Sequence, residues 1–298
     1  MLPFHCPIQP NEHLFSWVNR IHLLSGNIKL KSTLAFLNIE NKPFNCTGHN
    51  QAFLDAINFY RSEIVDDEIC FDRHTSFSLW ALSFNSSDYN ERRSNNSVLM
   101  PSMNEKGAFS FNSRWKYCPN CIQDDIDKCG HSFWHVKHQL PSVTHCYLHK
   151  EVLIGNSIDF RDLRNCSLPQ TYDFSIPKQE VDPQLLNWSE FVVSIYNNLN
   201  QSPSFGETLK NRVINFLQLP TKIQTKHNDL FQDLQRQFDK EVPLTIRRHL
   251  FSFYSKPYRT QPRILRSTLG INHNIKHKHP VNWLIILYWL KDKISLDI

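Results

Sequence analysis

Glycine and long apolar runs are scarce in this sequence, and each absence excludes a class of protein. The 298 residues include only 7 glycines, and neither GxxxxGKS/T nor GxGxxG occurs, so nothing supports a nucleotide-binding loop. The most apolar stretch, Trp283 to Leu290, has eight residues, whereas a bilayer-spanning helix needs roughly 20. The start, Met1 to Pro7, lacks the charged residues and apolar run of a secretion signal. We therefore expect a cytoplasmic protein that makes no contact with a membrane.

The composition is that of a folded protein with metal-binding potential. Hydrophobic residues make up 40% of the chain and aromatic residues 12%, enough for packed cores. A length of 298 residues exceeds what one small core organises, so two or three domains are expected. The eight cysteines would be reduced thiols in the cytoplasm. Clustered cysteines in that compartment indicate metal binding.

Charge is distributed unevenly along the chain. Residues 207–298 hold 16 Lys and Arg against 7 Asp and Glu, a net of +9, whereas residues 1–206 hold 17 against 21, a net of −4. A basic C-terminal part suggests a polyanionic partner. The alternative is a solvated basic face without a partner.

Helical periodicity marks the N-terminal region. Residues 11–24 carry apolar side chains at three- and four-residue steps, with Asn11 as the expected cap and Gly26 as the stop. Further short helices are expected over residues 30–37 and 50–63. Three such helices permit a helix-turn-helix, and they permit any other small bundle equally well.

Loops and helices alternate in the remainder. The polar residues 88–105 predict a loop, and prolines mark 169–183 as a connector. Capping patterns at Asn187 and Ser204 predict the starts of two helices. Apolar spacing predicts a helix around Leu234 and others toward the C-terminus.

The most informative motif consists of two close pairs of soft metal ligands. Cys118 and Cys121 form a CxxC pair, and Cys146 and His149 follow as CxxH after 24 residues. Each pair can present both ligands from one turn, and two such turns can close a tetrahedral zinc site. A lone CxxC is often coincidental or redox-active, but the second pair favours zinc. Four protein ligands leave no open position, which indicates a structural ion.

Other cysteines, histidines and aromatic residues of the chain are candidates for metal ligands or for the core. Five candidates lack a partner at ligand spacing and are expected at the surface or beside the ligand set: Cys129, His131, His135, His138 and His145. The isolated cysteines are expected to be small buried hydrophobes: Cys6, Cys46, Cys70 and Cys166. The expected apolar cover of the metal is Trp115, Tyr117, Phe133, Trp134 and Leu140.

A zinc hydrolase is the competing interpretation of the motif. It needs three protein ligands, an open position and a general base. HExxH is absent, and Asp124, Asp125 and Asp127 are expected to be solvated. We therefore do not expect an enzyme.

These features predict a mainly α fold, in which helical domains of helix-turn-helix type flank a small Cys3His zinc module with minor β structure. The predicted domains are an N-terminal helical domain, the zinc-binding module and a basic C-terminal helical domain with a second helix-turn-helix, over residues 1–105, 106–160 and 161–298.

The residues around the ligand pairs form a longer ordered pattern. It contains Arg114-Trp115-Lys116-Tyr117-Cys118-Pro119-Asn120-Cys121, then Gly130 and Trp134, then His138-Gln139-Leu140-Pro141-Ser142-Val143, Cys146-Tyr147-Leu148-His149 and Leu153. The start of the chain adds Pro3, Glu12, Leu14, Ser16-Trp17 and Arg20, and a later segment adds His74-Thr75-Ser76-Phe77, Phe84 and Arg92-Arg93. In this order the pattern resembles the TniQ family, which includes TnsD, the target-site selector of certain cut-and-paste transposons. His279-Pro280 and the apolar helix after them loosely resemble a later segment of the family.

The resemblance implies a helix-turn-helix region, a Cys3His zinc module and further helical DNA-binding elements. It implies one structural Zn²⁺ on Cys118, Cys121, Cys146 and His149. The implied partners are double-stranded DNA and a TnsC-type AAA+ ATPase that activates the transposase, and a homodimer is one assembly to consider. The implied location is the bacterial cytoplasm, on the nucleoid when bound to DNA.

Basic residues interleaved with aromatics are the candidate DNA contacts. They are Arg247, Arg248, Lys256, Arg259, Arg263, Arg266, Lys276 and Lys278. Such side chains would contact phosphates, which supplies affinity without sequence information. Residues 243–255, 262–269 and the Trp283 helix could form the second helix-turn-helix. Two functions therefore compete: a target selector that binds DNA and recruits the ATPase, and an adaptor that docks on an RNA-guided CRISPR surveillance complex.

Overall fold

The structure is a computed structural model, and it describes residues 6–38, 73–94, 109–111, 114–159, 167–171, 179–220, 227–256, 264–270 and 278–296. In this part the chain is mainly helical, with one two-stranded antiparallel sheet. The predicted fold class, mainly α with a small β component beside the Cys3His residues, is confirmed.

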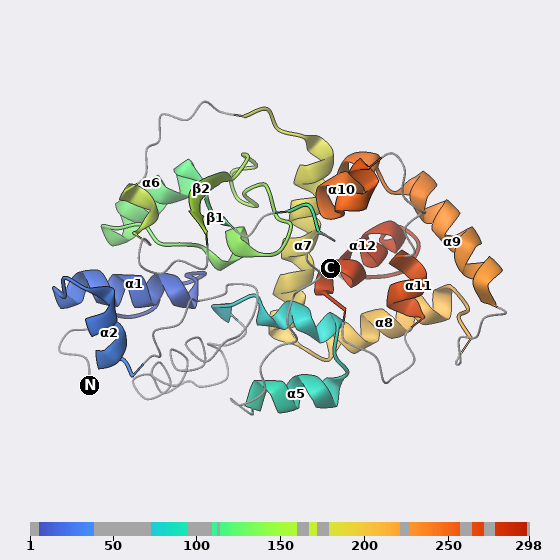
Figure 1. The fold of residues 1–298 in the computed structure, drawn as a ribbon, viewed down its shortest axis with the longest axis horizontal. Coiled ribbons are helices and arrows are strands. Elements are labelled where there is room, and N and C mark those ends of the chain that lie inside the picture. Colours follow the sequence, from blue (N-terminus) through green and yellow to red (C-terminus); the bar gives the residue numbers. More distant parts are fainter. Residues whose placement is uncertain are drawn as a thin grey trace.

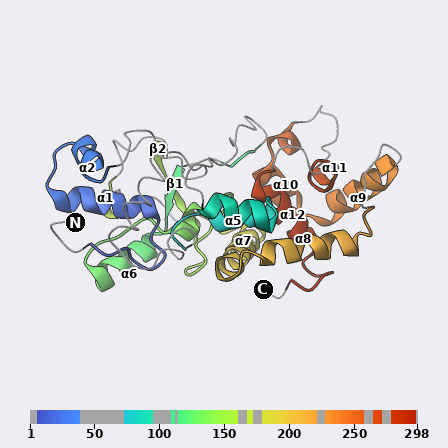
Figure 2. The ribbon, with the colours of Figure 1, turned by 90° about the horizontal axis from the view of Figure 1, so that it is seen from below.

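The elements follow one another in three groups. The N-terminal group is α1 (Leu14–Ser25), α2 (Leu30–Phe36), the 3-10 helix η1 (Phe77–Leu82) and α5 (Ser86–Ser94). The central group is β1 (Arg114–Tyr117), α6 (Pro119–Cys129), η2 (Val136–Gln139), β2 (Ile154–Asp159) and η4 (Pro169–Thr171). The C-terminal group is α7 (Pro183–Gln201), α8 (Phe205–Phe216), α9 (Asn228–Glu241), α10 (Leu244–Leu250), η6 (Ser252–Ser255), α11 (Ile264–Leu269) and α12 (Pro280–Leu290). Helices α1, α2 and α6 and the sheet lie at one end of the molecule, α9 and α11 lie at the other, and α7 stands between them (Figures 1 and 2).

Helix α1 begins three residues later than the sequence predicts. Its N-cap is His13, whose Nδ1 accepts a hydrogen bond from the Phe15 amide at 3.2 Å. The predicted cap, Asn11, instead has a positive φ of 63°. Its carbonyl oxygen accepts the amide of Val136 at 2.8 Å, so Asn11 serves a long-range contact rather than the helix start. Gly26 ends the helix as predicted, and the structure shows that it does so in the left-handed conformation.

Helices α2 and α5 also lie in the N-terminal group. Helix α2 confirms the expected helix over residues 30–37. The expected helix over residues 50–63 lies outside the described residues. The prediction of a loop over residues 88–105 is wrong for residues 88–94, which belong to helix α5. The Asn85 side chain caps this helix by accepting the Asp88 amide at 2.7 Å, and Tyr89 anchors it in the core.

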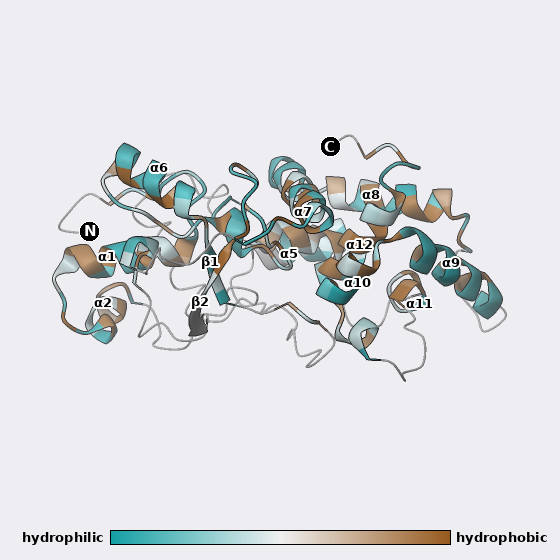
Figure 3. Ribbon diagram, turned by 90° about the horizontal axis from the view of Figure 1, so that it is seen from above, coloured by the Kyte–Doolittle hydropathy of each residue, from teal (hydrophilic) through white to brown (hydrophobic). Residues whose placement is uncertain are grey.

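The C-terminal helices follow the predicted periodicity closely. Helix α7 starts one turn before the predicted cap at Asn187, because the Asp182 side chain accepts the amides of Gln184 and Leu185 and Pro183 favours the first helical position. Ser204 precedes α8 as predicted. Helix α9, largely hydrophilic in Figure 3, buries a single stripe that includes Leu234.

Helix α12 is the centre of the C-terminal core. All of its residues, Pro280 to Leu290, are buried, which agrees with the expectation of a buried apolar helix. Among the described residues, no helix combines the length and apolarity needed to cross a bilayer.

Packing joins segments that the sequence assigns to different domains. The 3-10 helix η1 packs against α7, α8 and α12, although it belongs to the predicted first domain. The approach to α8 is close: a Cβ on Gly206 would lie 2.7 Å from the carbonyl oxygen of Ala81, so only glycine fits there without a shift. The domain boundaries stay a prediction, and the core contacts cross them.

His279 caps α12 from inside an aromatic cluster. Its Nδ1 accepts the Val281 amide at 3.1 Å, and its ring contacts Trp80, Phe109 and Phe111 at centroid distances of 5.7, 4.8 and 6.0 Å. Because the ring is buried among apolar groups, its pKa is lowered to about 3. The folded protein therefore holds this imidazole neutral under conditions in which the unfolded chain protonates it.

We expect acid to destabilise the protein through His279. An ordinary histidine pKa is about 6.5, so below that pH the unfolded state binds a proton that the folded state refuses, and about 2 kcal/mol of stability is lost by pH 5. His279→Asn keeps a capping acceptor but does not titrate, and its unfolding free energy should fall less between pH 7.5 and pH 5. Urea unfolding of both proteins at the two pH values measures the difference. Parallel pH dependences would contradict this assignment.

Candidate metal centre

The first ligand pair lies at the junction of β1 and α6. Cys118 follows the strand in an extended conformation as the N-cap of α6, and Pro119 occupies the first helical position. The Ile122 amide donates to the Cys118 carbonyl oxygen at 3.1 Å, which places Cys121 in the same first turn. One tight turn therefore presents both thiols on one side.

The second pair lies in a turn that leads into β2. The Lys150 amide donates to the Cys146 carbonyl oxygen at 2.9 Å, and Lys150 takes a positive φ of 60° that reverses the chain after His149. The sheet brings this turn to the first one, since Tyr117 of β1 pairs with Ile154 of β2. Backbone pairing thus assembles two turns that are far apart in sequence.

The four predicted ligands meet with the dimensions of a zinc site. The donor atoms of Cys118, Cys121, Cys146 and His149 all lie within 4.8 Å of one another. The Sγ atoms of Cys121 and Cys146 are 3.6 Å apart, and His149 Nδ1 lies 3.5, 3.3 and 3.7 Å from the sulfurs of Cys118, Cys121 and Cys146. A tetrahedron with Zn–S of about 2.3 Å and Zn–N of about 2.0–2.1 Å has S–S edges of roughly 3.8 Å and S–N edges of roughly 3.5 Å. The donor set and its spacing both fit Zn²⁺.

A contact of the His149 Nε2 atom, the ring nitrogen that faces away from the sulfurs, sets the orientation of the imidazole. Nδ1 faces the sulfurs, and Nε2 lies 3.3 Å from Asp124 Oδ2 on α6. A carboxylate that accepts the second N–H fixes the tautomer and the plane of a metal-binding imidazole.

The three aspartates of α6 differ in their exposure. Asp124 is partly exposed and Asp127 is exposed, which agrees with the expectation that they are solvated. The expectation is wrong for Asp125, which is buried and whose Oδ2 lies 2.8 Å from His135 Nε2.

The sulfurs crowd one another electrostatically. Hydrogen bonds from the thiols of Cys118 and Cys121 lower the pKa of Cys146 to about 2. The neighbouring sulfurs, together with burial, raise the pKa of Cys121 far above its usual range. Negative charge on one sulfur therefore opposes ionisation of the next, which a bound cation would relieve.

The other candidates of this region lie outside the ligand set. Among the described residues, the group able to hold a metal consists of the four predicted ligands alone. Cys129 is exposed, His135, His138 and His145 are buried, and His138 Nε2 comes within 3.8 Å of Cys121 Sγ. The predicted apolar cover is buried throughout: Trp115, Tyr117, Phe133, Trp134 and Leu140.

The segment between the ligand pairs is held by contacts that spacing could not reveal. Gln139 hydrogen-bonds both backbone groups of Lys116, at 3.0 and 2.7 Å, and so ties η2 to β1. Ser189 of α7 accepts the amides of Thr144 and His145 at 3.1 and 3.2 Å. The loop before Cys146 is therefore fixed to the C-terminal helices.

The N-terminal motifs pack against the same segment. The His13 amide donates to the Trp134 carbonyl oxygen at 2.8 Å, and the Leu14 amide donates to that of His74 at 2.9 Å. Glu12 pairs with His135 in an isolated β-bridge. Three stretches from residues 12–20, 74–77 and 134–139 thus meet beside the metal centre.

The predicted DNA contacts are differently placed. Arg247 is engaged within the fold: its Nη1 lies 3.0 Å from Asp239 Oδ1, its Nε donates to the Val242 carbonyl oxygen, and its guanidinium lies over Tyr254. Arg248 and Lys256 are exposed, whereas Arg266 and Lys278 are partly buried. Arg259, Arg263 and Lys276 lie outside the described residues.

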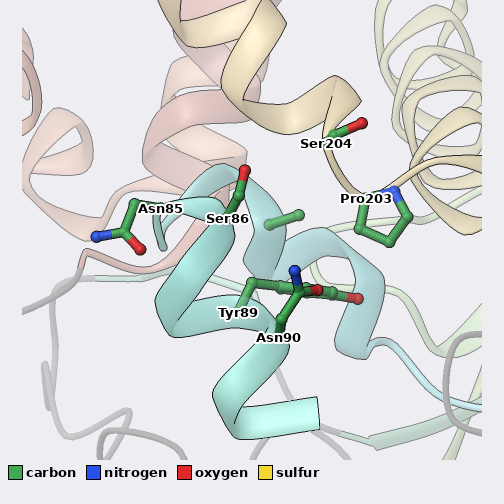
Figure 4. A pocket seen from close by; sticks show the side chains of 7 residues that line it. Asn85, Ser86, Tyr89, Asn90, Pro203 and Ser204 are labelled. Atoms are coloured by element: carbon green, nitrogen blue, oxygen red, sulfur yellow. The ribbon is translucent and has the colours of Figure 1, made fainter. Parts of the chain in front are cut away.

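A pocket of about 190 Å³ opens between α5 and the turn from α7 to α8 (Figure 4). Its lining consists of Ala81, Asn85, Ser86, Tyr89, Asn90, Pro203 and Ser204. Among these described residues the pocket lining has no thiol, imidazole or carboxylate, so it offers neither a soft metal ligand nor a general base at neutral pH.

The chain was compared with curated protein sequences and with sequence models of protein families. No curated protein sequence matches the chain. The sequence model of the TniQ family matches residues 3–153, which contain α1, α2, η1, α6 and both ligand pairs. This match spans half of the chain and includes the Cys3His cluster and the N-terminal motifs that pack beside it. On that evidence the chain belongs to the TniQ family.

Proposed function

We propose that this chain is a target-selection adaptor for DNA transposition, which binds double-stranded DNA, recruits a TnsC-type AAA+ ATPase and performs no catalysis itself. The observation that carries the proposal is the closed Cys3His cluster within the segment that matches the family. A catalytic zinc site keeps a position for water or substrate, whereas four protein ligands fill the shell.

One structural Zn²⁺ on Cys118, Cys121, Cys146 and His149 is part of the proposal. When bound, such an ion supplies folding free energy and not reactivity. The chain's own residues position the ligands: Asp124 orients His149, and the β1–β2 pairing holds the two ligand-bearing turns together. The result is a rigid scaffold beside the N-terminal helices.

The DNA surface is proposed to lie on the basic C-terminal part. Arg248 at the end of α10 and Lys256 after η6 are exposed, and Arg266 on α11 is partly exposed. Arg247 has a different role, because Asp239 and Tyr254 engage its guanidinium. Phosphate contacts by the first three would give affinity without base reading.

We expect the triple variant R248Q/K256Q/R266Q to bind DNA with a weaker salt dependence. Each phosphate contact contributes about 0.9 to the slope of log K against log salt, so losing three lowers the slope by roughly 2–3. Filter-binding titrations between low and physiological salt measure it. Arg236→Gln is the matched control, since Arg236 is an exposed arginine of α9 that pairs with Asp233. An unchanged slope in the triple variant would dismiss these residues as the DNA surface.

A second function is favoured by the engagement of Arg247. Because this guanidinium is engaged by Asp239, less free basic surface remains for direct DNA binding, which favours an adaptor that leaves sequence choice to the base pairing of a guide RNA. A gel shift on duplex DNA without guide RNA separates the two functions. Retention of a TnsC-type ATPase on the immobilised chain tests the part that both share, and failure to retain it contradicts both.

A further inference from the structure

A buried imidazole lies directly behind one sulfur of the metal centre. His138 Nε2 is 3.8 Å from Cys121 Sγ, a distance suited to an N–H···S hydrogen bond because sulfur is larger than oxygen. The residue is 1% exposed, so water does not compete for this N–H. No other contact of the described residues explains why an imidazole, rather than an apolar ring, fills this position.

Neighbouring groups fix the plane of this ring. His138 stacks on His135 at a centroid distance of 4.9 Å and an interplanar angle of 29°, and His135 stacks on Phe133 at 4.6 Å. His135 is held in turn by Asp125, whose Oδ2 lies 2.8 Å from its Nε2. Asp125 stands one turn after Cys121 on α6, so the helix that carries the thiol also positions the ring column.

We propose that His138 is a positioning residue that donates a hydrogen bond from Nε2 to the zinc-bound thiolate of Cys121, and thereby lowers the nucleophilicity of this sulfur. The inference rests on the proposed zinc site. Three thiolates, one neutral imidazole and a divalent ion leave one excess negative charge on the sulfurs. An N–H donor withdraws part of that charge and holds the sulfur in place.

The three sulfurs provide an internal comparison. Cys146 accepts a backbone amide, that of His149, at 3.5 Å, and this donor does not depend on His138. Removing the His138 N–H should therefore act on Cys121 and leave Cys146 unchanged. A purely space-filling role for His138 predicts no such selectivity.

The test is site-resolved alkylation of the zinc-loaded full chain by iodoacetamide, followed by peptide mass spectrometry. In His138→Phe, which keeps the ring but not the donor, Cys121 should react about tenfold faster, the rate factor that corresponds to one charge-assisted hydrogen bond. His138→Gln retains an N–H near the position of Nε2 and should react at nearly the wild-type rate. His74→Phe is the matched control, because His74 is a buried imidazole that bonds the Glu12 carbonyl oxygen instead of a sulfur.

A spectroscopic measurement gives a second readout. In the cobalt-substituted protein, loss of the N–H donor should move the thiolate-to-metal charge-transfer band to lower energy in His138→Phe and leave it in place in His138→Gln. If His138→Phe does not fold, His138→Met removes the donor with a smaller increase in side-chain volume and serves in both measurements.

The outcomes separate this inference from the proposed function. One zinc per chain with an unchanged Cys121 rate and an unmoved cobalt band overturns the role of His138 and leaves the zinc site standing. Equal acceleration at all three cysteines indicates general loosening and also overturns it. A wild-type protein without zinc overturns both the site and this inference.

Discussion

Replacing Cys146 by serine is expected to release the metal and to unfold the segment between β1 and β2. Cys146 joins the second turn to the first, with its Sγ 3.6 Å from that of Cys121. A serine hydroxyl is a poor zinc ligand. Without the ion, the thiols of Cys118 and Cys121 and the serine hydroxyl would be left buried beside the partly buried His149. Metal binding by small zinc modules is worth about 10 kcal/mol or more, so we expect the unfolding free energy to fall by at least about 5 kcal/mol.

Metal analysis and urea unfolding measure this effect together. The variant should carry much less than one zinc per chain and should unfold at a lower urea concentration, and a chelator should bring the wild type to the same behaviour. Cys129→Ser is the matched control, because Cys129 is an exposed thiol of α6 outside the ligand cluster. A Cys146→Ser protein with full zinc content and wild-type stability would remove the basis of the metal centre.

The loss should extend beyond the metal-binding segment. Ser189 of α7 accepts two amides of the loop before Cys146, and the His249 Nε2–H of α10 donates to the Ser142 carbonyl oxygen at 2.8 Å. These contacts require the loop to keep its shape. We therefore interpret the metal centre as the element that fixes the family-specific segment to the C-terminal helices.

Local patterns made the Cys3His cluster and most of the described helices predictable. A CxxC pair and a CxxH pair each depend on one turn, and the periodicity of residues 11–24 or around Leu234 depends on one helix face. These signals need no knowledge of distant contacts. The same holds for Gly26, whose left-handed conformation ends α1.

The helix caps and the buried ion pairs could not be predicted from the sequence, because they depend on how distant parts of the chain pack together. The caps at Asn85 and Asp182 compete with other polar residues nearby, and the folded core decides which one starts the helix. Asp125 looks solvated in the sequence, but it is buried and pairs with His135. Arg247 looks free in the sequence, but it is partly buried and pairs with Asp239. Charge and spacing alone do not distinguish a buried ion pair from an exposed charge.

Because Arg20 belongs to a buried ion pair, its replacement is expected to lower the unfolding free energy strongly. Glu12 is fully buried, and Arg20 binds it twice, through Nε to Oε1 at 2.8 Å and through Nη2 to Oε2 at 2.7 Å. The Gln9 amide supplies a third hydrogen bond to this carboxylate at 2.8 Å. Glu12 also pairs with His135 and accepts His74 Nδ1 at its carbonyl oxygen, so it lies where the N-terminal motifs meet the metal-binding segment.

We expect Arg20→Met to lower the unfolding free energy by about 3–5 kcal/mol, because it leaves a buried carboxylate without its counter-charge. The double variant E12L/R20M removes both charges and should be more stable than Arg20→Met, since the unpaired charge, and not the lost attraction, dominates the cost. Urea unfolding of the wild type, both single variants and the double variant completes the cycle. If Arg20→Met costs less than about 1 kcal/mol, or if the double variant is the less stable of the two, the pair does not anchor the N-terminal segment as its geometry indicates.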